Sequence, residues 1–131
     1  EIGVRLVGSE MCIRDRCGDL LDVYSGNDDI IVPMMSIGAK GVISVISNIM
    51  PKETHEITQL CLANNCEEAA KLQMKYLELI NNLFIEVNPI PIKEAMNQMK
   101  MPSGPCRLPL CEMTDEHIET LKNSMKKIGL I

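Results

Sequence analysis

Residues 20–47 read LLDVYSGNDDIIVPMMSIGAKGVISVIS, and this stretch decides the fold. Residues 20–26 are a short apolar run that ends in glycine, which is typical of a buried strand. Residues 41–47 are continuous, apolar and rich in β-branched side chains, as expected for a strand that is buried on both faces. The residues between the two runs suit a short helix. The pattern therefore predicts two parallel strands joined by a helical crossover.

The two ends of this crossover helix are marked by particular residues. Asn27 is placed to cap it, and Asp28 and Asp29 fall in its first turn, where carboxylates interact favourably with the helix dipole. Gly38 is placed to end it, because glycine readily adopts the left-handed conformation of a C-cap. Two adjacent aspartates could also form a metal or acid–base pair. Neighbours at a helix start rarely converge, so the capping interpretation is favoured.

The rest of the chain is predicted to be helical. Pro51 opens a helix that runs to about residue 64, and residues 66–86 place apolar side chains on one helix face. Pro89 and Pro91 fix the entry to another helix, and a last helix follows Thr114 as its cap. The sequence thus predicts an α/β fold. Its two βα units occupy residues 17–64, and a three-helix extension occupies residues 65–131.

Charge and composition exclude several classes of partner. The net charge is −5 with acids and bases interspersed, so the sequence contains no basic patch that would hold a nucleic acid. No apolar run approaches the roughly 20 residues of a membrane span. His55 and His117 fall on polar helix faces and are predicted to be solvated. The cysteines lack the two-residue spacing of a zinc knuckle, so we expect reduced thiols, no metal, and a cytoplasmic protein.

The N-terminal segment differs from the remainder. Residues 5–16, RLVGSEMCIRDR, have no helical or strand period and lack the pattern of a signal peptide. Residues 6–15 resemble the translation of a common transposase sequencing adaptor. We therefore expect residues 1–16 to be a non-native, adaptor-derived segment. We also expect the native chain to be cut on this side, because two parallel strands do not make a stable sheet alone.

Several motifs within residues 17–131 carry a resemblance to a known family. They are VYSGNDD, GAKGVISVISN, LFIEVNPIPIKEAM, GPCRLPL and the final KKIGLI. Together they resemble the C-terminal part of the 4-hydroxy-tetrahydrodipicolinate synthases, also called dihydrodipicolinate synthases. GAKGVISV is shared with sister aldolases, whereas E-x-NPIPIK followed by RLPL is more particular to the synthases. The resemblance implies the last two βα units of a (β/α)8 (TIM) barrel, with residues 20–26 as strand seven and residues 41–47 as strand eight.

The resemblance also implies a function. Members of this family are lyases of lysine and diaminopimelate biosynthesis that condense pyruvate with L-aspartate 4-semialdehyde. A strand-six lysine forms a Schiff base with pyruvate, and a tyrosine relays protons. Neither residue matches a position in this chain, so the chain is expected to hold no catalytic residue and to be inactive as given. No cofactor is implied, and intact members are homotetramers built as dimers of dimers.

Two other interpretations stay open. One is another pyruvate-dependent class I aldolase of the N-acetylneuraminate lyase type. The other is a non-catalytic module in which the helical tail mediates assembly. Product analysis of the full enzyme would distinguish such an aldolase from a synthase. The sequence upstream of residue 17 would distinguish a non-catalytic module from a synthase.

Few site residues carry over from the family. Ile43 matches the strand-eight isoleucine whose backbone carbonyl lines the pyruvate pocket, and Gly26 matches the strand-seven glycine beside bound pyruvate. Asn48 and Asn88 are expected near the mouth of the barrel, where the chemistry of such folds takes place. From the residues alone, Ile43 is better explained by core packing and Gly26 by the end of a strand.

Overall fold

The computed structural model describes residue 13 and residues 15–131 of the chain. Most of the segment expected to be adaptor-derived lies outside these residues, so that expectation stays a prediction. Within the described part, β1 (Tyr24–Ser25) and β2 (Gly41–Val42) pair in parallel, with Tyr24 opposite Gly41 and Ser25 opposite Val42. The predicted strand–helix–strand unit is therefore confirmed.

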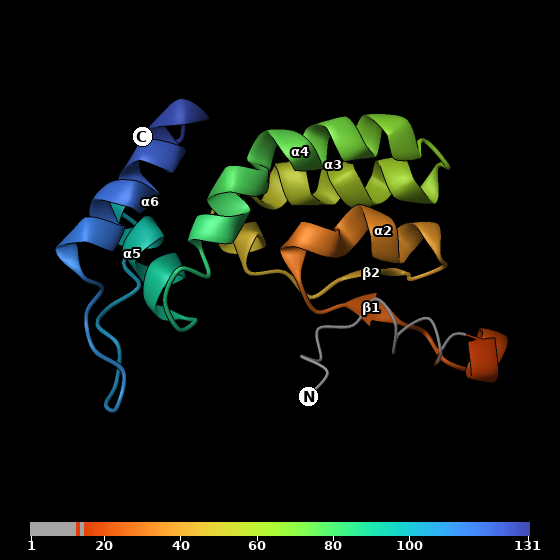
Figure 1. Cartoon of the computed structure of the whole chain (residues 1–131), viewed down its shortest axis with the longest axis horizontal. Coiled ribbons are helices and arrows are strands. Elements are labelled where there is room, and N and C mark those ends of the chain that lie inside the picture. The colour runs from red at the N-terminus through yellow and green to blue at the C-terminus, as the bar shows by residue number, and fades with distance from the viewer. Residues whose placement is uncertain (1–12, 14) are drawn as a thin grey trace.

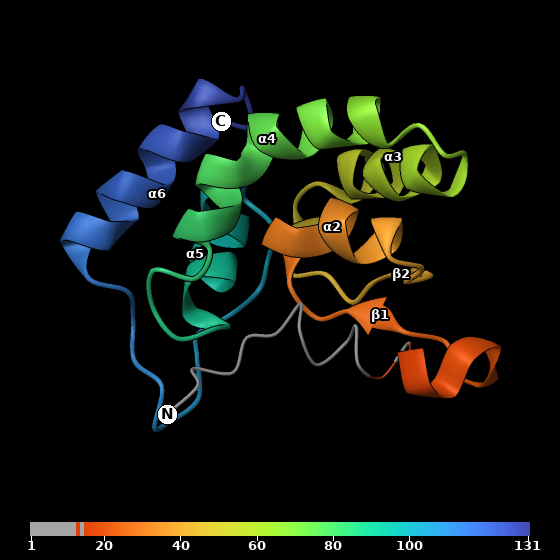
Figure 2. The same ribbon diagram turned by 45° about the vertical axis from the view of Figure 1, so that its right-hand side comes forward.

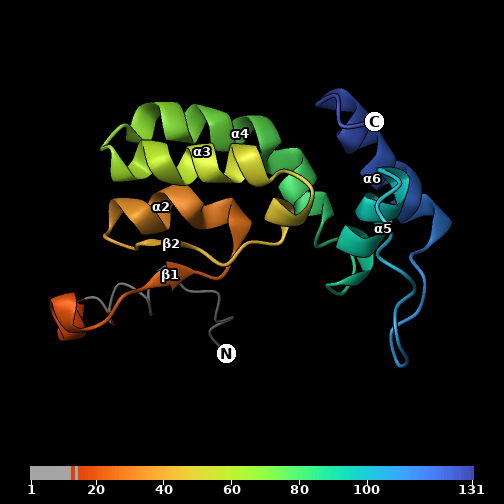
Figure 3. The same cartoon turned by 180° about the vertical axis from the view of Figure 1, so that it is seen from behind.

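The helices that follow the strands lie in layers (Figure 1). The crossover begins with the 3-10 turn η2 (Asp28–Ile30) and continues as α2 (Ile31–Ser36), which contacts both strands. The long helices α3 (Pro51–Leu62) and α4 (Cys66–Asn82) run antiparallel and pack on the side of α2 away from the strands, as the rear view also shows (Figure 3). The buried core between these layers is aliphatic and rich in methionine, including Met34 and Met35. Methionine side chains thus fill part of this core.

Both strands are shorter than the sequence predicts. Leu20 belongs to the 3-10 turn η1 (Gly18–Leu20) and is 93% exposed, so the prediction of a buried strand is wrong at its first residues. β2 stops after Val42, and another 3-10 turn, η3 (Ile46–Asn48), takes the place of the predicted strand end. Ile43 is 72% exposed, so burial on both faces is also wrong there. Only two residues of each strand have a pairing partner among the described residues, and this limits the length of both strands.

The ends of the crossover are only partly as predicted. Gly38 has φ +102°, and its N–H donates to the Met35 carbonyl at 3.0 Å, so the helix ends at glycine as expected. Asn27 does lie at the N-cap position, but its side chain makes no capping hydrogen bond. The Ser25 hydroxyl instead donates to the Asn27 carbonyl at 2.8 Å and accepts from the Asn27 N–H at 3.3 Å. The serine hydroxyl thus stabilises this turn in place of the predicted asparagine cap.

One buried glutamine joins the helical extension to the first βα unit. Gln73 on α4 is 6% exposed, and its Oε1 accepts from the Val32 N–H of α2 at 2.9 Å. Its Nε2 donates to the Asp29 carbonyl. One side chain thereby satisfies a donor and an acceptor at the start of α2, where backbone groups have no partner within the helix.

The last two helices form a separate pair. α5 (Ile90–Gln98) and α6 (Asp115–Lys127) pack together at the end of α4, and α5 also contacts η3 (Figure 2). As predicted, Pro89 precedes α5 at its N-cap. A glycine of positive φ, Gly129, follows α6. In the part of the chain that the structure describes, no helix is long and apolar enough to cross a membrane.

A carboxylate in the loop between α4 and α5 holds the start of α6. Glu86 Oε1 accepts from the Thr114 N–H at 3.1 Å, from the Thr114 hydroxyl at 2.9 Å, and lies 2.6 Å from His117 Nδ1. Two predictions are therefore wrong. Thr114 donates its hydroxyl to Glu86 and does not cap its own helix, and His117 is a partner of Glu86 and is only partly solvated. His55 is exposed, as predicted.

The first test concerns Gln73. Replacing it with methionine keeps the size of the side chain but leaves the buried Val32 N–H without its acceptor, so Gln73→Met should lower the free energy of unfolding by about 2 kcal/mol. Urea unfolding followed by circular dichroism measures this change. Gln59→Met, at an exposed position on α3, is the matched control and should change stability by less than about 0.5 kcal/mol. Equal effects of the two substitutions would contradict the role given to Gln73.

The second test concerns Glu86 and pH. The contact with His117, followed by the Thr114 N–H, lowers the pKa of Glu86 below its ordinary value. A carboxyl whose pKa is lowered by folding stabilises the fold above its unfolded pKa, and this contribution is lost as the pH falls through the folded pKa. The stability difference between the wild-type chain and Glu86→Gln should therefore shrink as the pH falls below about 4. Glu67→Gln, which removes one partner of an exposed ion pair with Lys71, is the control and should change stability at neutral pH by less than about 0.5 kcal/mol.

Candidate functional site

The two residues expected to border pyruvate lie side by side at the ends of the strands. The Ile43 N–H donates to the Ser25 carbonyl at 2.8 Å, which extends the parallel ladder by one bond beyond β2. Gly26 and Ile43 therefore follow the paired residues at the carboxyl ends of neighbouring parallel strands. This is the end at which barrel enzymes place their chemistry. The Ile43 side chain is exposed, so packing in the core of the described residues does not explain it.

Gly26 faces open space within the described residues. A Cβ built on Gly26 would meet no atom within 4 Å, and its φ lies outside the left-handed region. Neither backbone strain nor crowding inside this chain therefore requires glycine at this position. The space beside Gly26 is therefore open to a group that approaches the strand ends from outside the described residues.

Asp28 connects the end of the first strand to the turn after the second. It is 1% exposed, and its Oδ2 accepts from the N–H groups of Val45 and Ile46 at 2.9 and 3.0 Å. The prediction that Asp28 interacts with the first turn of its own helix is therefore wrong. Asp28 binds the start of η3, 17 and 18 residues further along the chain. Asp29 is exposed and lies in the first turn of η2, as predicted.

Asn48 and Asn88 line the same groove. It has a volume of about 500 Å³ and is also lined by Ser44 and Val45, which follow β2, and by Lys93 of α5. Asn48 Nδ2 donates to the Val45 carbonyl at 2.8 Å. The structure thus brings both asparagines to the end of β2 that holds Ile43.

Three lysine and tyrosine side chains near the strands are poorly placed for chemistry at the carboxyl ends of the strands. The Lys40 N–H donates to the Val23 carbonyl at 2.8 Å at the start of β2, which is the opposite end of the strand from Ile43. The Tyr24 ring lies against Gly41, where an added Cβ would be 3.5 Å from two ring carbons. Lys93 lines the groove, but its Nζ donates to the Pro105 carbonyl at 2.7 Å.

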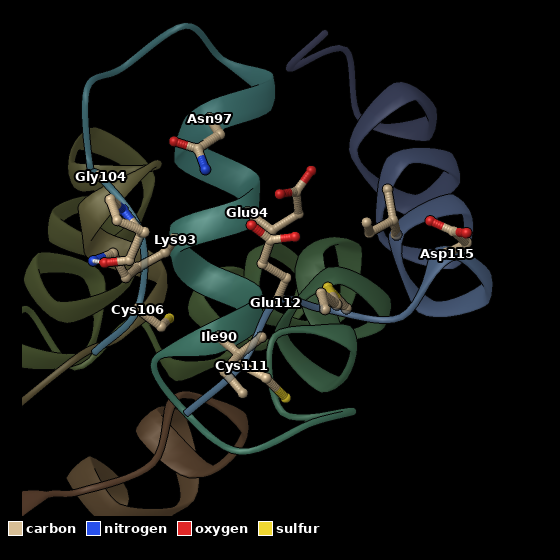
Figure 4. A pocket seen from close by; sticks show the side chains of 12 residues that line it. Ile90, Lys93, Glu94, Asn97, Gly104, Cys106, Cys111, Glu112 and Asp115 are labelled. Atoms are coloured by element: carbon tan, nitrogen blue, oxygen red, sulfur yellow. Dashed lines mark hydrogen bonds between the residues drawn. The ribbon is translucent and has the colours of Figure 1, made fainter. Parts of the chain in front are cut away.

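A second cavity lies between α5, α6 and the loop that joins them (Figure 4). Its volume is about 490 Å³, and carboxylates of Glu94, Glu112 and Asp115 line it together with Cys106 and Cys111. Across the described residues, no three such side chains gather closely enough to hold a metal ion. No local pattern in the sequence predicts this cavity, because it forms only when α5, α6 and the loop between them pack together.

The cysteines of the described residues are free thiols at positions 17, 61, 66, 106 and 111. Burial, with a smaller contribution from Cys66, raises the pKa of Cys61. A raised pKa keeps a thiol protonated at neutral pH, and the protonated form is a poor nucleophile. Cys61 is therefore no candidate for nucleophilic catalysis.

Comparison with known proteins agrees with this arrangement. Residues 4–128 match the profile of the Dihydrodipicolinate synthetase family. The chain belongs to this family. The predicted resemblance to dihydrodipicolinate synthases is thereby confirmed.

Individual members of the family are closely similar to the chain. It is 50% identical over 131 residues to the 4-hydroxy-tetrahydrodipicolinate synthase of Acetivibrio thermocellus, covering all of this chain and 44% of that protein. It is 53% identical over 119 residues to the synthase of Clostridium perfringens strain SM101, covering 91% of this chain and 41% of that one.

A solved structure extends the similarity to the fold. The chloride-inhibited dihydrodipicolinate synthase of Acinetobacter baumannii, in complex with pyruvate, superposes with a TM-score of 0.88 at 36% identity, covering 93% of this chain and 42% of that one. The predicted fold class, part of a TIM barrel followed by helices, is confirmed. The chain spans less than half the length of each of these relatives.

The third test separates a structural from a functional need for Gly26. Because its surroundings are open and its φ is ordinary, Gly26→Ala should change the free energy of unfolding by less than about 0.5 kcal/mol. Gly38→Ala is the control, since φ +102° at Gly38 disfavours any side chain and should cost about 1 kcal/mol. Chemical denaturation of the two variants measures both values. A large loss with Gly26→Ala would show that the glycine is needed for the fold itself.

Proposed function

We propose that this chain is the C-terminal part of a 4-hydroxy-tetrahydrodipicolinate synthase. The intact lyase would condense pyruvate with L-aspartate 4-semialdehyde in lysine and diaminopimelate biosynthesis. In this proposal the chain forms one wall of the pyruvate site, with the Ile43 carbonyl and Gly26 next to pyruvate and with Asn48 and Asn88 at the mouth. The observation that carries the proposal is the single hydrogen bond from Ile43 to Ser25, which places Ile43 and Gly26 together at the carboxyl ends of both strands.

The groove supports the same orientation. It is lined by the polar residues Ser44, Asn48 and Asn88, and it lies at the end of β2 that holds Ile43. A small polar substrate that enters the groove would therefore meet hydrogen-bonding groups. The named relatives are synthases at 50% and 53% identity, which favours this enzyme over a lyase of the N-acetylneuraminate type.

The remaining parts of the active site are proposed to come from outside this chain. The Schiff-base lysine and the proton-relay tyrosine belong to strands that precede β1 in the barrel. Lys40 lies at the far end of β2, and the Lys93 ammonium is hydrogen-bonded to a carbonyl, which supports this division. The intact enzyme is proposed to be a cytoplasmic homotetramer, built as a dimer of dimers, that needs no cofactor.

A chimera tests the proposal directly. Residues 17–131 of this chain replace the matching part of the Acetivibrio thermocellus synthase, which supplies the rest of the barrel. We expect the folded chimera to condense pyruvate with aspartate 4-semialdehyde and to give no product from pyruvate and N-acetylmannosamine. A chimera that has the circular dichroism of the parent but makes no Schiff base with pyruvate would overturn the proposal.

Reductive trapping tests where the lysine lies. When the chain alone is treated with pyruvate and borohydride, we expect no mass increase, since a Schiff base needs an unprotonated amine in a suitable pocket. The chimera under the same conditions should gain one reduced pyruvate adduct. Labelling of Lys93 or Lys40 in the isolated chain would contradict the proposed division of the site.

A further inference from the structure

Asp28 and the strand ends form a closed arrangement of hydrogen bonds. On one side, the Ser25 carbonyl accepts from the Ile43 N–H at 2.8 Å. On the other side, Asp28 Oδ2 accepts from the N–H groups of Val45 and Ile46. Gly26 and Asn27 lie between the two anchor points on the first segment, and Ser44 lies between them on the second. The backbone next to the proposed pyruvate site is thus held from both sides.

We propose that Asp28 is a positioning residue for the substrate site. Its carboxylate fixes the turn after β2 and thereby the direction of the Ile43 carbonyl, without touching the substrate itself. This inference rests on the proposed function where pyruvate is concerned, but the effect on the backbone does not depend on it.

Without Asp28, the N–H groups of Val45 and Ile46 would lose their acceptor. The Ile46 side chain is 3% exposed, so its N–H lies in a buried region and losing its acceptor is unfavourable. The sequence of residues 41–47 favours a continuing strand, as its β-branched residues predict. A buried carboxylate that accepts two N–H groups at the start of η3 opposes that tendency and selects the turn. Asp28 therefore favours the turn η3 over a continued strand at Val45 and Ile46.

The state of the second carboxylate oxygen suggests how to distinguish a hydrogen-bonding role of Asp28 from a role that needs its charge. Asp28 Oδ1 is buried and has no hydrogen-bond partner among the described residues. If Asp28 acts only by accepting two N–H groups through Oδ2, an amide oxygen can replace that function. Asp28→Asn should then keep the turn, whereas Asp28→Ala should lose it. A role that needs negative charge or proton transfer would fail in both variants.

Amide hydrogen exchange of this chain tests the positioning directly. We expect Asp28→Ala to speed exchange of the Val45 and Ile46 amides by about tenfold or more, as for loss of a hydrogen bond to a charged group. Asp28→Asn should speed it by less than about threefold, and Asp29→Ala, which removes the exposed neighbouring carboxylate, should have no effect. The amides of Leu79 and Leu121, in α4 and α6, report whether the variants remain folded. Unchanged exchange at Val45 and Ile46 in a folded Asp28→Ala chain would overturn the proposal.

Steady-state kinetics of the chimera test the consequence for the substrate. We expect Asp28→Ala to raise the KM for pyruvate by about tenfold, with a much smaller change in the KM for the aldehyde, and Asp28→Asn to recover most of the loss. A merely structural role would lower kcat per total protein through a smaller folded fraction and leave the pyruvate KM unchanged, which would overturn the proposal. An inactive parent chimera would overturn the proposed function and the pyruvate part of this inference, while hydrogen exchange would still decide the backbone part.

Discussion

The parallel pairing of Tyr24 with Gly41 and of Ser25 with Val42 is the constraint on which the rest of the structure depends. Parallel strands need a connection that returns the chain to the same end, and α2 is that connection. Once α2 lies against the strands, its outer side is available for α3 and α4, and α5 and α6 then follow from the end of α4. The same pairing places the carboxyl ends of both strands next to each other, which creates the candidate site.

So short a pairing leaves much of the geometry to side chains. Two buried polar side chains fix the relative positions of these segments. Each is hydrogen-bonded to backbone groups near the start of a turn or helix. Asp28 joins the two strand ends, and Gln73 joins the crossover to α4. Each forms hydrogen bonds that offset the cost of removing a polar group from water, and so each favours one relative arrangement of the segments it joins.

The sequence predicted the helices well and the strands less well, for a physical reason. Helix limits depend on local signals such as Pro51 at the first position of α3 and Pro89 at the N-cap of α5, and these signals were correct. Strand length depends on partners, which a local pattern does not contain, so residues 43–47 were expected to continue a strand that ends at Val42. Among the site residues, the closeness of Gly26 and Ile43 follows from parallel pairing. The contacts of Asp28 and Gln73 could not be predicted, because their partners lie 17 to 44 residues away.

The dual hydrogen bonding of Gln73 has a consequence at the level of the gene. A glutamine codon becomes a glutamate codon or a lysine codon by one base change. Glutamate carries no amide N–H for the Asp29 carbonyl, lysine offers no acceptor for the Val32 N–H, and both would bring a charge into a position that is 6% exposed. Both of these single-base substitutions should therefore lower the stability of the fold. Position 73 should tolerate substitution less well than positions on the exposed side of the same helix.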